Sequence, residues 1–309
     1  MARKLRLEFA GALYHVLNRG DRGEEIFRDD QDRARFLATL AEACDKTGWQ
    51  VHAYCLMRNH FHLVVETPQA NLVAGMKWFL GTYTGRFNRR HQLVGHLFSG
   101  RYKSLLIGDS GSYLRTVGEY VHLNPVRAKL LRAEEPLHGY PWSSFPEYLK
   151  PRSQRPPWLR VDRVLGESGI PRDSPAGRRA FERLLEARRR QAADKSFNQI
   201  RRGWCFGDEV FREELLERVS TQAGPQHYGE ELRESAAAKA ERIVAEELRQ
   251  RGWQERELAV RRKGDPVKVA IAERLRRETT MTLAWTAHRL QMGTKTHLAH
   301  LLYWRRRTG

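Results

Sequence analysis

The segment Met57–Glu66 reads Met-Arg-Asn-His-Phe-His-Leu-Val-Val-Glu and sets two histidines into an otherwise apolar run. In a β-strand, residues two apart point to the same side, so His60 and His62 would share one face of a sheet. The residues that alternate with them would form an apolar face that needs a core: Phe61, Leu63 and Val65. Two neighbouring imidazoles on one side of a strand whose other side is apolar could supply two ligands of a metal site. The alternative is a half-exposed strand whose two histidines are solvated.

Sequence patterns on both sides of this strand alternate between strand and helix. Strand patterns cover 12–18, 49–56 and 100–107, and helical patterns cover 31–47, 70–91 and 110–122. The order β-α-β-β-α-β-α predicts an α+β fold with a ferredoxin-like, four-stranded antiparallel sheet and helices on one face. The other face would remain free for a site or for nucleic acid.

The charge of the chain favours a polyanionic partner. Its 309 residues include 55 Lys and Arg side chains against 37 Asp and Glu side chains, a net charge of +18. No apolar run approaches the roughly 18 residues of a membrane-spanning helix, and no secretory signal is recognisable. We therefore expect a soluble, cytoplasmic, nucleoid-associated protein with no membrane partner. The three isolated cysteines predict neither a disulfide framework nor a cysteine-based zinc site.

The chain changes character in the proline-rich segment 141–176. This composition indicates either an extension that lies over the first domain or a linker. Four aromatic side chains would anchor such an extension: Trp142, Phe145, Tyr148 and Trp158. A basic helix is expected at 176–194 and a further helix within 203–218. Residues 221–230 have the composition of a domain boundary.

Residues 261–309 hold 12 basic and 3 acidic side chains and resemble a helical DNA-binding unit. Helical patterns cover 266–279, 282–290 and 294–307, with the turn Gln291-Met292-Gly293 between the last two. A helix, a short glycine-containing turn and a basic helix are typical of a helix-turn-helix, whose last helix enters the major groove of DNA. A plain helical hairpin with a solvated basic face is the alternative.

A metal held by two histidines needs further ligands and a reacting group. The helix at 110–122 supplies Tyr120, and Asn124 follows four positions later, nominally on the same helical face. A tyrosine beside a divalent cation can attack a phosphodiester, because the cation withdraws charge from the scissile phosphate. Asn124 could complete the coordination, although Asn124-Pro125 is also a typical helix N-cap followed by proline. For Tyr120 the alternative is an ordinary core position, and Tyr102 and Tyr113 are competing nucleophiles.

Three motifs resemble those of the REP-associated tyrosine transposases, which are single-tyrosine transposases with a His-hydrophobic-His motif. They read Tyr-His-Val-Leu-Asn-Arg-Gly at 14–20, Met-Arg-Asn-His-Phe-His-Leu-Val-Val at 57–65 and Tyr-Val-His-Leu-Asn-Pro-Val-Arg-Ala at 120–128. The resemblance covers about residues 5–150. It implies a nuclease domain that uses Mg²⁺ or Mn²⁺ to cut single-stranded DNA near hairpins through a 5′-phosphotyrosine link. By position it implies the metal ligands His60, His62 and Asn124 and the nucleophile Tyr120.

We therefore predict a transposase domain at 1–150, a helical extension or linker at 151–225 and a helical, helix-turn-helix-like DNA-binding domain at 226–309. The expected function is a DNA endonuclease and strand transferase, as a monomer or homodimer. The alternatives are a helix-turn-helix regulator with a non-catalytic front domain, and a rolling-circle replication or conjugation initiator. DNA contacts are expected from these side chains: Arg19, Arg86, Arg89, Arg90, Arg101, Lys103, Arg127, Lys295, Thr296, His297, Arg305 and Arg306.

Overall fold

The computed structural model describes residues 7–132, 134–189, 197, 200, 204–222 and 230–308 of the chain. These residues form two compact units. The first unit takes in most of the chain up to residue 227. The second takes in the C-terminal segment from residue 230, together with 45–47 and 71–78.

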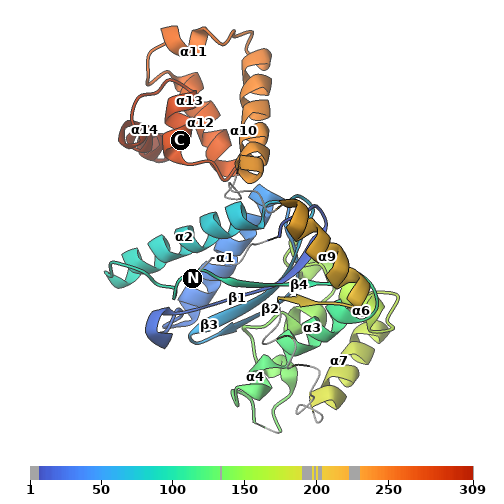
Figure 1. Ribbon diagram of the computed structural model, residues 1–309. Helices are drawn as coiled ribbons and strands as arrows, with labels where there is room; N and C mark the ends of the chain where they lie inside the picture. The colour runs from blue at the N-terminus through green and yellow to red at the C-terminus, as the bar shows by residue number, and fades with distance from the viewer. Residues whose placement is uncertain are drawn as a thin grey trace. The chain divides into compact units, whose positions relative to one another are not determined.

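A five-stranded sheet makes the first unit an α+β fold (Figure 1). The strand order is β2-β3-β1-β4-β5, and all neighbours are antiparallel except β4 and β5. The strands have these bounds: β1 Ala12–Arg19, β2 Gln50–Met57, β3 His60–Thr67, β4 Lys103–Ile107 and β5 Cys205–Phe206. The sequence predicted four strands and missed β5, because two residues are too few to show an alternating pattern.

The helices α1 (Asp30–Thr47) and α2 (Leu72–His91) cover one face of this sheet (Figure 1). Local signals fix the ends of α1. The Asp29 side chain accepts a hydrogen bond from the Asp32 amide and so caps the first turn. Gly48 ends the helix in the left-handed region, at φ 74°, which glycine adopts without strain.

The apolar side of the histidine strand meets this helix layer. The Phe61 ring centroid lies 5.0 Å from that of Phe36 in α1 and 6.4 Å from that of Phe79 in α2. Phe61, Leu63 and Val65 are all buried. The core face predicted from the period-two pattern is therefore confirmed.

The opposite face of the sheet, which carries the histidines, is not free as the sequence led us to expect. The helix α3 (Tyr113–His122) packs against β2 and β3. Its Tyr120 ring contacts His62 of β3. The expectation was wrong because α3 is amphipathic and buries its apolar stripe on this face: Leu114, Val117 and Val121.

Shorter elements and two longer helices complete the first unit. They are α4 Asn124–Arg127, α5 Phe145–Tyr148, α6 Asp162–Glu167, α7 Pro175–Arg189, α9 Glu209–Gln222 and the 3₁₀ turns Asp21–Gly23, Leu137–Gly139 and Arg152–Gln154. The basic helix predicted at 176–194 corresponds to α7 as far as residue 189. Residues 190–194 lie outside the described residues, as do positions 223–229 of the predicted boundary.

The proline-rich segment is an extension packed on β2 and not a free linker. Ser143 and Leu159 form backbone β-bridges to β2. Phe145 and Tyr148 are buried, as predicted for the anchors of an extension. The outer strand of a sheet exposes unpaired backbone donors and acceptors, and the extension covers part of that edge.

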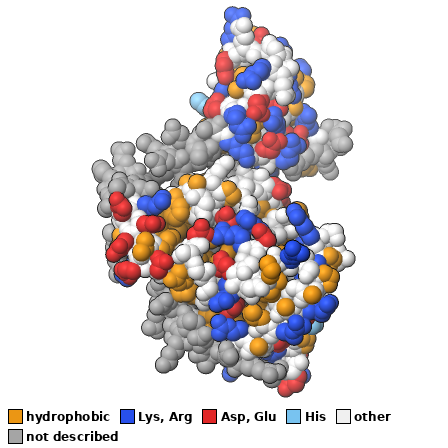
Figure 2. Space-filling view, turned by 90° about the vertical axis from the view of Figure 1, so that its right-hand side faces the viewer, with side chains coloured by type: hydrophobic (Ala, Val, Ile, Leu, Met, Phe, Trp, Pro, Cys, Tyr) orange, Lys and Arg blue, Asp and Glu red, His pale blue; other side chains and the backbone are white. Residues whose placement is uncertain are grey.

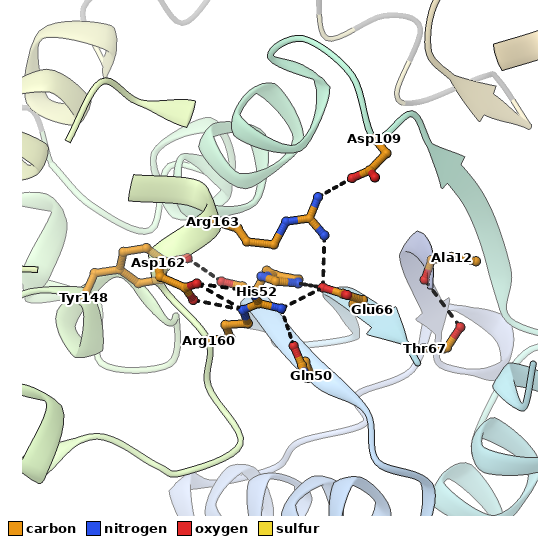
Figure 3. Close-up of polar contacts among 10 residues, drawn as sticks. All are labelled: Ala12, Gln50, His52, Glu66, Thr67, Asp109, Tyr148, Arg160, Asp162 and Arg163. Atoms are coloured by element: carbon orange, nitrogen blue, oxygen red, sulfur yellow. Dashed lines mark hydrogen bonds and ion pairs between the residues drawn. The ribbon is translucent and has the colours of Figure 1, made fainter. Parts of the chain in front are cut away.

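Glu66, near the end of β3, holds the extension against the sheet (Figure 3). Its Oε2 atom accepts hydrogen bonds from His52 Nε2 at 2.9 Å, Arg163 Nη1 at 3.1 Å and Arg160 Nη1 at 3.3 Å. The hydrogen bond from His52 lowers the pKa of Glu66 to about 2. Its carboxylate therefore stays charged and keeps two arginines of the extension in place. Arg163 also pairs with Asp109.

The C-terminal segment is helical (Figure 1). Its helices are α10 Glu230–Gln250, α11 Glu257–Val260, α12 Pro266–Glu278, α13 Leu283–Arg289 and α14 Lys295–Thr308. The last three match the predicted helices closely, whereas α10 and α11 were not predicted. An apolar core joins them, with Ile271, Leu275 and Leu298 fully buried. None of the helices in the described ranges is long and apolar enough to span a bilayer.

Lys268 in α12 is a fully buried cation at the centre of this second unit. Its Nζ donates to the backbone carbonyls of Leu258 at 2.7 Å, Arg261 at 3.0 Å and Gln291 at 3.3 Å. All three ammonium protons are used. Gln291 lies at φ 52° in the turn before α14, so the lysine joins α11, α12 and that turn.

We expect Lys268→Met to lower the free energy of unfolding of the second unit by roughly 3 kcal/mol or more, because buried carbonyls lose charged donors. Urea unfolding followed by circular dichroism measures the change. Lys263→Met is the control, since Lys263 is exposed, and it should stay within about 0.5 kcal/mol of wild type. Equal stability of the two variants would contradict the role of Lys268.

Candidate active site

The pairing of β1 with β3 assembles a group of histidines. In this antiparallel register Leu17 lies opposite His62, and Arg19 lies opposite His60. His15, two residues before Leu17, projects from the same face. Its ring lies edge to edge with that of His62 and nearly in the same plane, with centroids 5.1 Å apart and an interplanar angle of 17°. His15 Nε2 and His62 Nδ1 are 2.9 Å apart and share a hydrogen bond.

The two histidines of the strand motif lie side by side, as predicted. The ring centroids of His60 and His62 are 5.1 Å apart, with an interplanar angle of 83°. His60 Nδ1 lies 2.8 Å from Asn59 Oδ1, while Asn59 Nδ2 donates to the Gly23 carbonyl at 3.0 Å. That second bond fixes which way the amide points, so His60 Nδ1 must be the donor. The lone pair of His60 is therefore on Nε2.

The distance between the His60 and His62 rings is compatible with two ligands of one metal ion. Two imidazoles that bind one ion through Nε2 have ring centres about 5 Å apart, because each nitrogen lies about 2 Å from the ion. Within the described ranges, no group of three or more His, Cys, Asp or Glu side chains could hold a metal ion. Any further protein ligand among these residues must be of another type, such as an amide, and Mg²⁺ retains several water ligands in most sites.

Asn124, the predicted third ligand, is the first residue of α4, whose N-cap is Leu123. The alternative role of Asn124 as the helix cap is therefore not observed. Its side chain is buried, and its Nδ2 has no hydrogen-bond partner in the described part of the chain. A backbone hydrogen bond from Arg127 to Leu123 continues the helical path of α3 into α4. Coordination by Asn124 stays a prediction.

Tyr120 reaches the histidine pair from α3. Its ring centroid lies 5.6 Å from that of His15 and 5.7 Å from that of His62, and it meets both rings edge-on. The Arg127 guanidinium carbon lies 4.7 Å from the Tyr120 centroid. The competing Tyr113 instead packs on Phe206 of β5, at 5.0 Å. The structure thus places the predicted nucleophile against His62, one of the predicted metal ligands.

Burial keeps these imidazoles neutral, which is the form that binds metal. It lowers the pKa of His15 to about 4. Burial, and then the nearby charge of Arg19, lower the pKa of His60 to about 4. The pKa of His62 is also well below its ordinary value, because of burial and then of neighbouring groups that include His15 and Arg127.

Three of the basic residues predicted to contact DNA lie on β1, β4 or α4, the elements around the histidine face, and a fourth, Arg101, lies two residues before β4. Arg19 is paired with His60 in the β-ladder, and Arg127 packs over Tyr120. Lys103 is paired with Leu17 across β1 and β4 and is exposed, as is Arg101. Whether they contact DNA stays a prediction.

The other predicted DNA contacts of the first unit lie on α2, which covers the opposite face of the sheet. Arg86 pairs with Glu42 at 2.6 Å, and Arg90 pairs with Asp29 and Asp32, each at 2.6 Å. Arg89 is exposed. Basic and acidic side chains are similarly mixed over the face shown in Figure 2.

Residues 9–124 match the family model described as "Transposase IS200 like". This segment is therefore similar to the IS200-like transposases. It runs from the start of β1 to the start of α4 and contains the histidine group and Tyr120. The chain is also similar to a solved structure described as a REP-associated tyrosine transposase bound to a REP hairpin, at 15% identity and a TM-score of 0.41 over 53% of this chain and 93% of that one. No curated protein matches the sequence.

His15 is the member of this group that the sequence analysis missed. It stands in the first motif, but a local pattern does not give the register between β1 and β3. The signal that could have found it is a histidine at a fully buried strand position, where this residue type is less common than aliphatic ones.

We expect the free energy of unfolding to fall as the pH drops from about 6.5 towards 4. The pKa of His15 is about 4 and that of His122 about 3, because both are buried. In the unfolded chain both return to about 6.5. Below about pH 6.5 the unfolded state binds protons that the folded state does not. The free energy of unfolding therefore falls by up to about 1.4 kcal/mol per pH unit for each histidine.

Urea unfolding between about pH 7.5 and pH 5 measures this slope. The variant His122→Phe keeps an aromatic ring among Phe145, Tyr148 and Phe181. It should reduce the slope by up to about 1.4 kcal/mol per pH unit, since one titrating group is gone. A wild-type stability that does not change over this range would contradict the expectation.

Proposed function

We propose that this protein is a metal-dependent DNA endonuclease and strand transferase that acts on single-stranded, hairpin-forming DNA, with Tyr120 as its nucleophile. The observation that carries the proposal is the contact between Tyr120 and His62, at 5.7 Å between ring centroids, inside the segment that is similar to the IS200-like transposases. We also propose that the sheet is ferredoxin-like. The element order from β1 to β4, with β3 and β1 central, supports it.

The proposed reaction is a transesterification. The Tyr120 oxygen attacks phosphorus and forms a new ester bond while the bond from phosphorus to the 3′ oxygen breaks. The phenol gives up its proton, and the departing 3′ oxygen takes one up, which leaves a free 3′-hydroxyl and a 5′-phosphotyrosine. One phosphate ester replaces another, so the reverse step can rejoin strands without an external energy source.

The surroundings of Tyr120 suit this chemistry. Arg127 packs over its ring and would place a positive charge beside the reacting phosphate. The Phe197 ring lies 5.5 Å from Tyr120 and also contacts Arg127. Tyr120 is itself buried, so its position is set by packing and not by solvent. These contacts fix the position of the Tyr120 ring.

The proposed cofactor is Mg²⁺ or Mn²⁺, held by the Nε2 atoms of His60 and His62 with Asn124 as third protein ligand. When bound, such a cation withdraws charge from the scissile phosphate. The part of the protein is to hold two neutral imidazoles at a fixed separation. Their low pKa values, which follow from burial, support this role.

The adduct experiment described below also tests two other functions. A helix-turn-helix regulator would bind DNA through the second unit and have no use for Tyr120. A replication or conjugation initiator would share the tyrosine chemistry, but the match of residues 9–124 to IS200-like transposases favours strand transfer.

We expect Tyr120→Phe to form no covalent adduct with hairpin DNA, because the change removes only the attacking oxygen and keeps the ring. Incubation with labelled hairpin DNA and Mn²⁺, followed by denaturing electrophoresis, detects the adduct. DNA affinity should remain within about fivefold, since the loss of one hydrogen bond changes the binding free energy by about 1 kcal/mol.

Tyr113→Phe is the matched control, because Tyr113 lies on the same helix but packs on Phe206. It should form the adduct normally. An adduct that persists in Tyr120→Phe and disappears in Tyr113→Phe would show that the wrong tyrosine was chosen. If the wild type forms no adduct on any hairpin with Mg²⁺ or Mn²⁺, the enzyme proposal fails and the helix-turn-helix regulator becomes the favoured function.

We further propose that the second unit binds duplex DNA through α14 as a helix-turn-helix. The support is local. Lys295, Thr296 and His297 are exposed on the first turn of α14, while Leu298 and Leu302 are buried beneath them. Such a helix presents its N-terminal side chains to base edges. Arg305 pairs with Glu273 at 3.0 Å, and the side chain of Arg306 lies outside the described part of the chain.

We expect Lys295→Ala in the full-length protein to weaken duplex binding and to reduce the salt slope of log K by about 0.9, the value of one phosphate contact. Fluorescence anisotropy at several salt concentrations measures the slope. Arg249→Ala on α10 is the control, because Arg249 is equally exposed but lies on another helix. An unchanged affinity and slope in Lys295→Ala would favour a helical hairpin with a solvated basic face.

A further inference from the structure

His15 is a buried histidine whose side chain has one hydrogen-bond partner among the described residues. Its side chain is fully buried, and its Nε2 lies 2.9 Å from His62 Nδ1. Its other ring nitrogen, Nδ1, is buried with no partner within the described ranges. A buried polar atom without a partner costs roughly 1–3 kcal/mol, which a ring without nitrogens would avoid. Such an atom in a core calls for an explanation other than stability.

The hydrogen bond between the two rings decides which nitrogen of His62 can bind a cation. A neutral imidazole carries one proton, on Nδ1 or on Nε2. If His62 Nδ1 donates to His15, the lone pair of His62 is on Nε2, where a cation can be bound. If His15 donates instead, His62 carries its proton on Nε2 and cannot be a ligand through that atom. Whether His15 accepts or donates in this hydrogen bond therefore decides whether His62 can bind a cation through Nε2.

The neighbouring His60 already shows the arrangement that a ligand needs. Its Nδ1 donates to the Asn59 amide oxygen, and Asn59 is itself oriented by the Gly23 carbonyl. For His62 the corresponding neighbour is His15, whose Nε2 lies 2.9 Å from His62 Nδ1. If His15 accepts a hydrogen bond from His62 Nδ1, as Asn59 accepts one from His60 Nδ1, both proposed ligands have their lone pair on Nε2.

We propose that His15 is a positioning residue for the metal site. It accepts the Nδ1 proton of His62, so that His62 presents the lone pair of Nε2 to a divalent cation. The hydrogen bond runs nearly within the planes of both rings, which differ by 17°, and so orients the plane of His62 at the same time. Outer partners of this kind orient ligating histidines in many metal sites. The inference rests on the proposed function, in which His60 and His62 bind Mg²⁺ or Mn²⁺.

The test compares two substitutions that pack similarly and differ in hydrogen bonding. His15→Phe keeps an aromatic ring but has no acceptor, whereas His15→Gln offers an amide oxygen to His62. Mn²⁺ affinity is measured from the spin-resonance signal of the free ion. We expect His15→Phe to bind Mn²⁺ about 10–100-fold more weakly, and His15→Gln to remain within about threefold of wild type. His122→Phe, a buried histidine bonded to Ser144, is the control and should also remain within about threefold.

A second measurement locates the proton directly. In wild-type protein saturated with Mg²⁺, nitrogen NMR of the His62 side chain should find the proton on Nδ1. A proton on Nε2, or equal Mn²⁺ affinity of His15→Phe and wild type, would overturn the role of His15 and leave the metal site standing. A folded His15→Gln that binds as weakly as His15→Phe would also overturn it. If the wild type binds no Mn²⁺, the metal site itself fails, and the role of His15 with it.

Discussion

The antiparallel pairing of β1 with β3 is the interaction on which the candidate site depends. Each strand alone presents its histidines on one side, and the backbone hydrogen bonds between them fix which residues become neighbours. A shift of one residue would move His15 to the other face, into the layer of Phe36 and Phe79. In the observed register, His15 instead lies within hydrogen-bonding distance of His62, and Arg19 lies opposite His60.

The helix α3 converts this strand face into a site with restricted access to water. Its apolar stripe packs on β2 and β3, and the same packing presses Tyr120 against His15 and His62. Burial then has two consequences that act together. It keeps the imidazoles neutral, and it strengthens any charge interaction formed between them and a bound strand. A solvated histidine pair would offer neither advantage.

Within each unit, a charged side chain with several partners joins separate elements. Glu66 ties Arg160 and Arg163 of the extension to the sheet, and Lys268 joins three carbonyls around the turn before α14. In both cases the charged atoms have partners that compensate for lost solvation. Much of the large basic surplus is likewise paired, as with Arg274, which contacts Glu246, Glu247 and Glu278. The net charge therefore overstates the number of arginines that are free to meet DNA.

The sequence by itself determined the features that depend on neighbouring residues. The alternation of His60 and His62 with Phe61 and Leu63 gave both faces of β3, and helical patterns in the last segment predicted α12, α13 and α14. Three short motifs also indicated the resemblance to a transposase family and pointed to Tyr120. Only the tertiary structure decided that α3 covers the histidine face, that the proline-rich segment lies along β2, that β5 joins the sheet and that His15 belongs to the site. These features depend on register and packing between residues far apart in the chain, and local periodicity carries no information about either.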